Sequence, residues 1–247
     1  MELCELFKQY LQHLFLGKRC EAREVVLAAH DRGVTAGILL QQIIWPASEQ
    51  VDKLYRDHHI DRITEHMASR INRMLADQLH AVVARKPKTG RRAIVVSGEG
   101  EVSELNAQIT SDLLEGEGFH VWFMGAGVPN DEILQFAGKI NPDLLCICGA
   151  QPGDIPDIRR MIALIREVGV CQDMQVMTVG GVFARAPGLT EEVRAELHAA
   201  SPGEAVRLMQ DHPVRIPLPD MPEPGRRRKR RRATVVPAHR SRTAPGD

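Results

Sequence analysis

Residues 100–109, with the sequence GEVSELNAQI, follow a short apolar run, Ala93-Ile94-Val95-Val96, and begin an amphipathic pattern. An apolar run that ends at a glycine and continues as a helix is typical of the first strand and helix of an open α/β sheet. Ligands of such sheets bind at the turns between strand and helix, near the amino end of the helix. The stretch therefore predicts an α/β domain with a ligand site beside Ser103.

The same alternation of apolar runs and amphipathic segments continues through the C-terminal half of the chain. It predicts strands at 93–97, 120–124, 144–148 and 175–179. It predicts helices at 103–115, 130–138 and 156–168, and a last helix at either 191–199 or 202–210. Such an order indicates a parallel, right-handed, doubly wound sheet of the flavodoxin-like (Rossmann) type.

Upstream of this region, residues 2–84 carry apolar side chains at helical spacing almost throughout, which predicts a four-helix bundle. The helices should break near Gly17, at Asp31-Arg32-Gly33 and around Asp57-His58-His59, and Pro46 should start or kink a helix. The basic segment ARKPKTGRR at 84–92 marks the change of period. We therefore expect a helical domain at 1–85 and an α/β domain at 92–212.

The remaining residues, 213–247, contain ten Lys and Arg against three Asp and Glu, although the whole chain of 247 residues has no net charge. Their Pro- and Arg-rich composition predicts a disordered basic tail. Seven consecutive basic residues, from Arg226 to Arg232, would favour non-specific attachment to nucleic acid.

Composition also narrows the class of protein. Hydrophobic residues make up 43% of the chain, enough for a sizeable core, but no apolar run is long enough to cross a membrane. Five cysteines without a CxxC pair argue against a disulfide framework or a zinc knuckle. We expect a cytoplasmic protein with reduced thiols, in which Cys146 and Cys148 are buried in a strand.

Three turns at the predicted carboxyl ends of the strands carry a pattern that resembles the cobalamin-binding domain family. The family pattern is Asp/Glu-x-His-x-x-Gly, then Ser-x-Leu, then Gly-Gly. The corresponding residues here are Glu101, Ser103 and Asn106, then Cys148 and Ala150, then Gly180 and Gly181. The interval of 41 residues between Asn106 and Cys148 is the usual one in the family.

The helical half resembles the four-helix cap that covers the upper face of the corrin ring in these proteins. In light-sensing, cobalamin-dependent regulators, a Trp is followed ten positions later by Glu-His. Tyr55 stands at the Trp position here, and Glu65 and His66 follow at that spacing. The first turn is also closer to the regulator form than to the form common in methyl-transfer proteins.

The resemblance implies a corrinoid as cofactor, bound by the ten residues named above, but Ser103 replaces the histidine that ligates cobalt from below. A serine hydroxyl is a poor ligand for a transition metal. The cofactor would then bind either with its base off and water or nothing below the cobalt, or with its own base on the cobalt and in a shallower position. Haem, with His58, His59 or His66 as candidate ligands, and a ligand-free regulatory module are the alternatives.

We therefore expect a non-enzymatic corrinoid sensor or regulator that partners a tetrapyrrole and a regulatory protein. The alternative is a corrinoid carrier that partners a methyltransferase. No helix-turn-helix motif precedes the helical half, so the DNA-binding domain usual in such repressors is missing.

Overall fold

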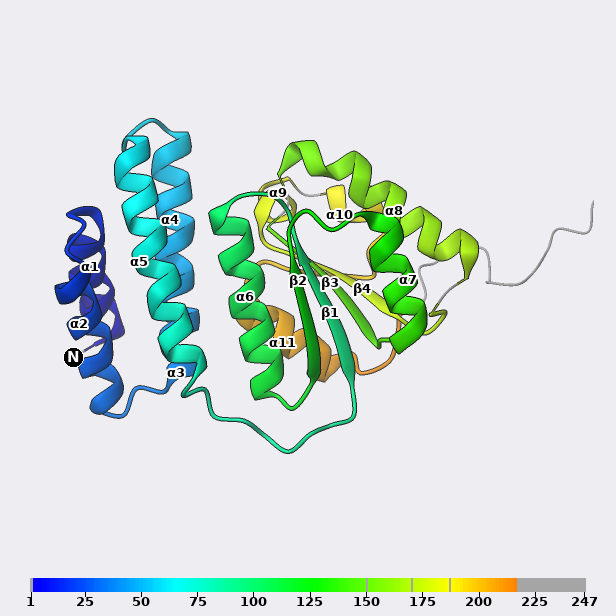
Figure 1. The fold of residues 1–247 in the computed structure, drawn as a ribbon, viewed down its shortest axis with the longest axis horizontal. Helices are drawn as coiled ribbons and strands as arrows, with labels where there is room; N and C mark the ends of the chain where they lie inside the picture. Colours follow the sequence, from blue (N-terminus) through cyan, green and yellow to red (C-terminus); the bar gives the residue numbers. More distant parts are fainter. Residues whose placement is uncertain (1, 150, 170, 187, 217–247) are drawn as a thin grey trace, which may run out of the picture.

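The computed structural model describes residues 2–149, 151–169, 171–186 and 188–216, and it confirms the predicted fold class. A bundle of helices forms the N-terminal half, and an α/β domain follows it (Figure 1). The exposed segment of residues 81–91, without regular secondary structure, connects the two halves.

The described residues of the helical domain form four continuous helical segments, as predicted. The elements are α1 (Leu3–Phe15), α2 (Arg19–Asp31), α3 (Ala36–Leu39), the π-helix η1 (Leu40–Ile44), α4 (Trp45–Arg56) and α5 (Arg62–His80). α3, η1 and α4 run on from one another without a break. The wide π turn immediately precedes Pro46, which lacks a backbone N–H and lies in the first turn of α4.

The core of the helical domain is aliphatic, with one buried aromatic at its centre. Tyr10 is fully buried, and its hydroxyl donates a hydrogen bond of 2.5 Å to the Asn72 carbonyl oxygen. Burial raises the pKa of this phenol far above its usual value. Leu105, Ile109 and Leu113 of the following domain belong to the same apolar cluster. The helical domain therefore buries its open side against the first helix of the α/β domain.

The α/β domain contains a five-stranded parallel sheet. Its strands are β1 (Arg92–Ser97), β2 (His120–Gly125), β3 (Leu144–Cys148), β4 (Gln175–Val179) and β5 (Leu197–Ala199), in the order β2-β1-β3-β4-β5. The helices are α6 (Glu101–Gly116), α7 (Asn130–Ile140), α8 (Ile155–Val168), α9 (Gly181–Arg185), α10 (Leu189–Val193) and α11 (Pro202–Asp211), with a 3-10 turn η2 (Pro152–Asp154) before α8. This order is that of the flavodoxin-like sheet, whose ligands bind beyond the carboxyl ends of the strands.

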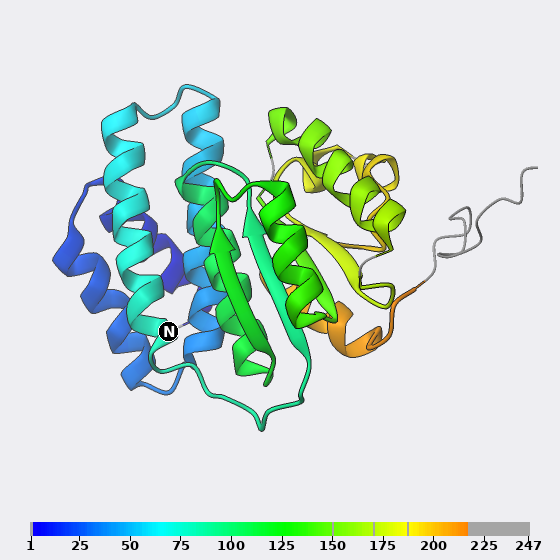
Figure 2. The ribbon, with the colours of Figure 1, turned by 45° about the vertical axis from the view of Figure 1, so that its right-hand side comes forward.

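Alternate residues of the strands face two different helical layers. Ala93, Val95 and Cys146 pack with α6 and α11, whereas Ile94 and Ile147 pack with α7 and α8. Cys146 and Cys148 are fully buried, as predicted. The helical domain lies beyond α6, on the outer side of the first layer (Figure 2).

Two alternative positions were predicted for the last helix, and only one of them is correct. α11 matches the prediction at 202–210, but the alternative at 191–199 is wrong, because that stretch contains the end of α10 and the strand β5. The end of α10 and the three-residue strand β5 share those residues, so neither period is sustained long enough to be recognised.

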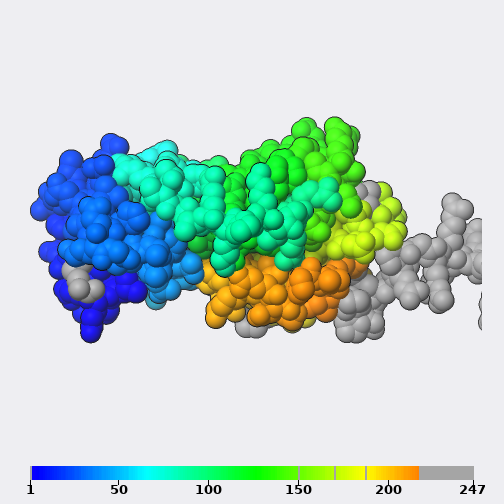
Figure 3. All heavy atoms as spheres, turned by 90° about the horizontal axis from the view of Figure 1, so that it is seen from below, coloured from blue at the N-terminus to red at the C-terminus, as the bar shows by residue number. Residues whose placement is uncertain are grey.

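Packing continues past the expected domain end at residue 212. Arg91 donates a hydrogen bond of 3.2 Å to the Pro213 carbonyl, and the Arg215 guanidinium lies 2.9 Å from the fully buried Glu196 carboxylate. The rest of the predicted basic tail, residues 217–247, lies outside the described residues. In Figure 3, α11 (orange) lies along the lower side of the α/β domain in that view.

Candidate functional site

The first turn of α6 packs directly against the turn that follows β3. α6 begins at Glu101, directly after Gly100 with its φ of 106°, so Ser103 lies in the helix and not in a loop. Ser103 is 2% exposed, and its hydroxyl donates a hydrogen bond of 2.5 Å to the Gly149 carbonyl. A Cβ at Gly149 would lie 2.5 Å from the Ser103 Cα. Only glycine permits this approach, and its φ of 63° is also one that glycine favours.

The turns after β3 and β4 lie side by side. The Gly149 amide donates to the Val179 carbonyl at 2.9 Å, and the Gly180 amide donates to the Ala199 carbonyl at 2.8 Å. Gly180 and Gly181 have φ values of 60° and 58°, and a Cβ at Gly180 would have no neighbour closer than 3.8 Å. The structure thus brings Ser103, Cys148, Gly180 and Gly181 to one edge of the sheet. Ala150 lies outside the described residues.

Asn106 faces the helical domain. Its side-chain amide donates to the Glu49 carboxylate at 2.6 Å, and its carbonyl oxygen accepts from the Ser48 hydroxyl at 3.1 Å. Both partners lie on α4. The side chain that replaces the family's glycine therefore joins the two domains.

Glu49 is a site residue that the sequence did not reveal. Burial raises the pKa of its carboxyl, while the Asn106 hydrogen bond and the charge of Arg185 oppose that rise. Arg185 ends α9, the helix that begins at Gly181. A half-buried carboxyl with a perturbed pKa is therefore found where α4 meets α6, close enough to Arg185 of α9 to feel its charge.

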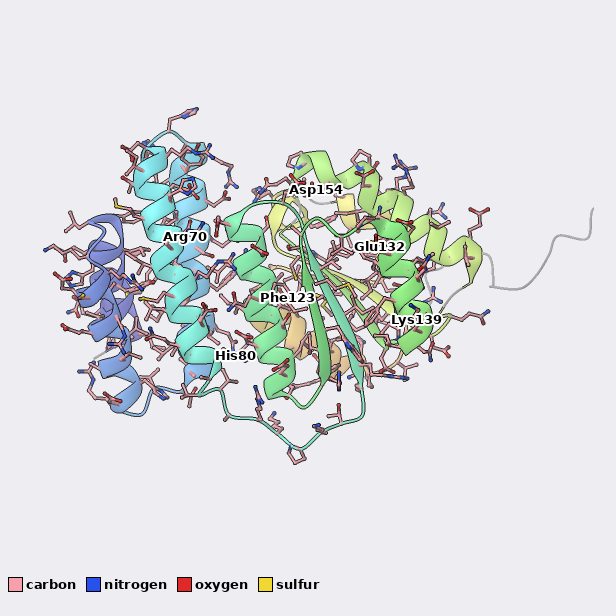
Figure 4. The ribbon with its side chains drawn as sticks, in the orientation of Figure 1. Arg70, His80, Phe123, Glu132, Lys139 and Asp154 are labelled. Atoms are coloured by element: carbon pink, nitrogen blue, oxygen red, sulfur yellow. The ribbon has the colours of Figure 1, made fainter. Side chains whose placement is uncertain are left out.

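A cluster of ion pairs holds the amino end of α6 to α5. Arg70 lies 3.0 Å from Glu101, and Arg73 lies 3.3 Å from Glu101 and 2.9 Å from Glu104. Figure 4 shows Arg70 on α5. The sequence contained a signal for these ion pairs. Two arginines lie three residues apart on one helix, and two glutamates lie three residues apart on another.

The predicted cap residues have different surroundings in the helical domain. Tyr55 is half-buried in the last turn of α4. Glu65 accepts a hydrogen bond of 3.2 Å from Ser69, whereas His66 lines a hollow of about 560 Å³ together with Gly17 and Arg19. Arg70, which pairs with Glu101 at the start of α6, lines the same hollow.

The carboxyl ends of the strands also border a hollow of about 120 Å³ on the α7 and α8 side of the sheet. Its polar lining includes Ser97, Glu99, Asn130 and Asp157. This volume is well below the roughly 300–1,000 Å³ of typical ligand pockets. A tetrapyrrole does not fit in this hollow, and the candidate site lies instead at the junction of α4, α6 and the glycine turns.

The described residues contain no group of three or more His, Cys, Asp or Glu side chains arranged to hold a metal ion. His58 and His59, two of the candidate haem ligands, are exposed in the turn between α4 and α5. None of the described helices is both long and apolar enough to cross a membrane.

Comparisons with known proteins identify similar corrinoid proteins. No family model matches the chain. It is 27% identical over 120 residues to dimethylamine corrinoid protein 1 of Methanosarcina acetivorans, covering 48% of this chain and 55% of that protein. It is also 27% identical over 120 residues to dimethylamine corrinoid protein 3 of Methanosarcina mazei, covering 48% of this chain and 71% of that protein. The chain thus matches little more than half the length of the first of these relatives.

A solved structure extends the likeness to both domains. The monomethylamine corrinoid protein of Methanosarcina barkeri superposes with a TM-score of 0.74 over 85% of this chain and 99% of that one, at 16% identity. At this identity the match establishes the fold, namely a helical domain followed by a Rossmann-like domain.

Proposed function

We propose that the protein binds a corrinoid and carries methyl groups for a methyltransferase that acts on methylated amines. The observation that carries this proposal is the similarity to dimethylamine corrinoid proteins, supported by a two-domain fold shared with a monomethylamine corrinoid protein. In this role the chain supplies a bound cofactor, and a separate protein catalyses the transfer.

The Gly180 turn is the part of the pattern that best suits a corrinoid. A Cβ at Gly180 would have no neighbour closer than 3.8 Å, so no side chain stands against this backbone. Ser103, in contrast, is buried, and its hydroxyl donates its proton to the Gly149 carbonyl. In this proposal the Gly180 turn would lie against the corrinoid, and Ser103 would provide no ligand to its metal.

A bound corrinoid would supply a cobalt ion able to accept and release a methyl group. The residues of this chain would hold and shield it. Asn106 and Glu49 would fix α4 over the first turn of α6, and Tyr55 would lie on the same side of the helical domain. Burial of the half-exposed Tyr55 ring against a cofactor would stabilise binding by about 1–3 kcal/mol.

A sensor or regulator is the second candidate function. The spacing of Tyr55, Glu65 and His66 and the basic stretch from Arg226 to Arg232 favour it. The relatives named above favour the carrier. We therefore rank the carrier first.

Reconstitution separates these functions. The full chain is dialysed against hydroxocobalamin at about 50 µM, where a dissociation constant near 10 µM gives clear retention. A carrier, reduced with titanium(III) and mixed with a dimethylamine methyltransferase, acquires radioactive methyl from labelled dimethylamine. A sensor retains cobalamin but acquires no label and binds nucleic acid in a light- or ligand-dependent way. A chain that retains no cobalamin contradicts both functions.

A further inference from the structure

The strand β2 forms one edge of the sheet and pairs on one side only. Among the described strands its neighbour is β1, with which it is parallel. The His120 amide points toward that side, because it donates to the Arg91 carbonyl at 2.8 Å. The backbone groups of Val121 and Phe123 therefore point outward, since neighbouring residues of a strand alternate in direction. In Figure 2, β2 lies at the front edge of the sheet.

Strand β2 itself carries little of the usual protection against strand pairing, although Lys86 and Lys88 of the connecting segment line a hollow with His120 and Val121 at its start. Its sequence, HVWFMG, contains no proline, lysine or acidic residue, and four of its six residues are large and apolar. Phe123 is 41% exposed. Natural proteins normally protect a free edge with charges, proline or a covering element. The one irregularity is a shift of register between Val95 and Val96, which leaves 120–123 straight.

The helix α7 flanks the edge on one face and carries charges of both signs. A hollow of about 660 Å³ lies between it and the end of β2, lined by Met124, Phe136, Glu132 and Lys139 among others. Glu132 and Lys139 are exposed, and neither forms an ion pair with another described residue. Figure 4 shows the two near opposite ends of α7.

The positions of these groups match a two-fold axis. The Phe136 ring contacts the Trp122 ring edge-on, with centroids 5.9 Å apart, so the middle of α7 is level with the middle of β2. Glu132 and Lys139 lie about equally far on either side of that level, roughly 10 Å apart along the helix. A two-fold axis at this level would pair β2 with a second β2 and place α7 antiparallel to its copy.

We propose that the β2 edge is the dimer interface between two copies of this chain. The two sheets join through antiparallel β2 strands, and Glu132 of each copy meets Lys139 of the other. Such an interface is self-complementary, as a two-fold contact requires. The outward backbone groups of Val121 and Phe123 find hydrogen-bond partners, and the Phe123 side chains are covered. The proposal does not depend on a bound cofactor.

Charge reversal in the full chain tests the interface. We expect the wild type to dimerise when its mass is measured by light scattering up to about 200 µM, which detects a dissociation constant near 100 µM. Glu132→Lys and Lys139→Glu should each raise that constant at least tenfold, because each places like charges opposite one another. The double variant, with both changes, should restore the wild-type constant to within about threefold, a difference of about 0.7 kcal/mol.

Two substitutions complete the test. Phe123→Lys should yield monomers, whereas Ile63→Lys, at a position 69% exposed on α5, should leave the dimer intact. Circular dichroism and thermal unfolding establish that each variant is folded, and the double charge variant keeps the test valid if Phe123→Lys does not fold. A monomeric wild type overturns the proposal and leaves the edge to another protein. A dimer that ignores Glu132→Lys, or that the double variant fails to restore, overturns it as well.

Discussion

The two sides of α6 are held by different physical means. Toward the sheet and the β3 turn, contact depends on shape, since Ser103 lies against the bare backbone of Gly149. Toward the helical domain, Leu105, Ile109 and Leu113 join the apolar core, and pairs of charged groups add to this contact, including Glu101 with Arg73 and Asp112 with His80. The first side therefore tolerates no added atom, whereas pH and salt can change the strength of the second.

We expect the largest change in stability from a substitution where α6 packs against the β3 turn. Gly149→Ala places a methyl group 2.5 Å from the Ser103 Cα, at a φ of 63°. It should lower the free energy of unfolding by about 3–5 kcal/mol. Urea unfolding measures this loss. Gly153→Ala, at a glycine with no heavy atom within 4 Å, is the control and should change stability by less than about 0.5 kcal/mol. Equal effects of the two would show that the turn can move away from α6.

The next largest change should be a gain in stability, from a substitution where α6 faces the helical domain. Asp112 is 6% exposed, and burial raises the pKa of its carboxyl to about 6 despite the nearby His80. Asp77 and Glu115 raise this pKa further. Since the folded state favours the protonated acid, stability from this group is full below pH 4 and is lost as pH rises to 6 and beyond.

Asp112→Asn should therefore stabilise the protein above pH 7. A shift of two pKa units corresponds to about 3 kcal/mol, and loss of the His80 ion pair should reduce the gain to about 1–2 kcal/mol. Unfolding measured at pH 4, 6 and 8 tests this, because the difference between variant and wild type should grow with pH. A variant that is less stable at pH 8 would mean that the His80 pair outweighs the cost of burial.

Ser103→Ala should cost about 1–2 kcal/mol, because the Gly149 carbonyl loses its donor in a buried place. The change adds no atom, so the fold should persist. We expect the same loss at low and high salt, since the bond joins uncharged groups. A strong dependence on salt would show that this side of α6 also depends on charge.

The smallest effect should follow Arg73→Ala, which removes the ion pairs with Glu101 and Glu104. Both glutamates are partly exposed, so the loss should stay near 1 kcal/mol and shrink in 1 M salt. Arg70→Ala, whose side chain is 65% exposed, is the matched control and should cost less. A larger loss of stability for Arg70→Ala than for Arg73→Ala would mean that Arg70 makes the more important contact between the domains.

The elements that a local sequence pattern determines could be predicted from the sequence. β3 and β4 lie at the predicted residues, because continuous apolar runs bounded by turns are distinct signals. β5 was missed because three residues carry too little pattern. α6 was predicted to start at Ser103, two residues late, because the residues after Gly100 were expected to form a ligand loop.

The contacts of the candidate site could not be predicted in this way. Ser103 and Gly149 are 46 residues apart, and Asn106 and Glu49 are 57 apart. Nothing in the neighbourhood of either partner specifies the other, since such contacts arise from how whole elements pack. Family resemblance pointed to turns that lie together at one edge of the sheet, and their role as a ligand site stays a prediction. It predicted Ser103 as part of an open site, whereas the structure buries Ser103 against Gly149.

The central claim is that this protein binds a corrinoid without a ligand from its own chain below the cobalt. Electron paramagnetic resonance of the full chain loaded with Co(II) cobinamide tests it most directly. Cobinamide lacks the nucleotide base, so a resolved splitting from an axial nitrogen must come from the protein. We predict bound cobinamide whose cobalt lines show no nitrogen splitting. A nitrogen triplet that becomes a doublet in protein labelled with ¹⁵N-histidine would contradict the account.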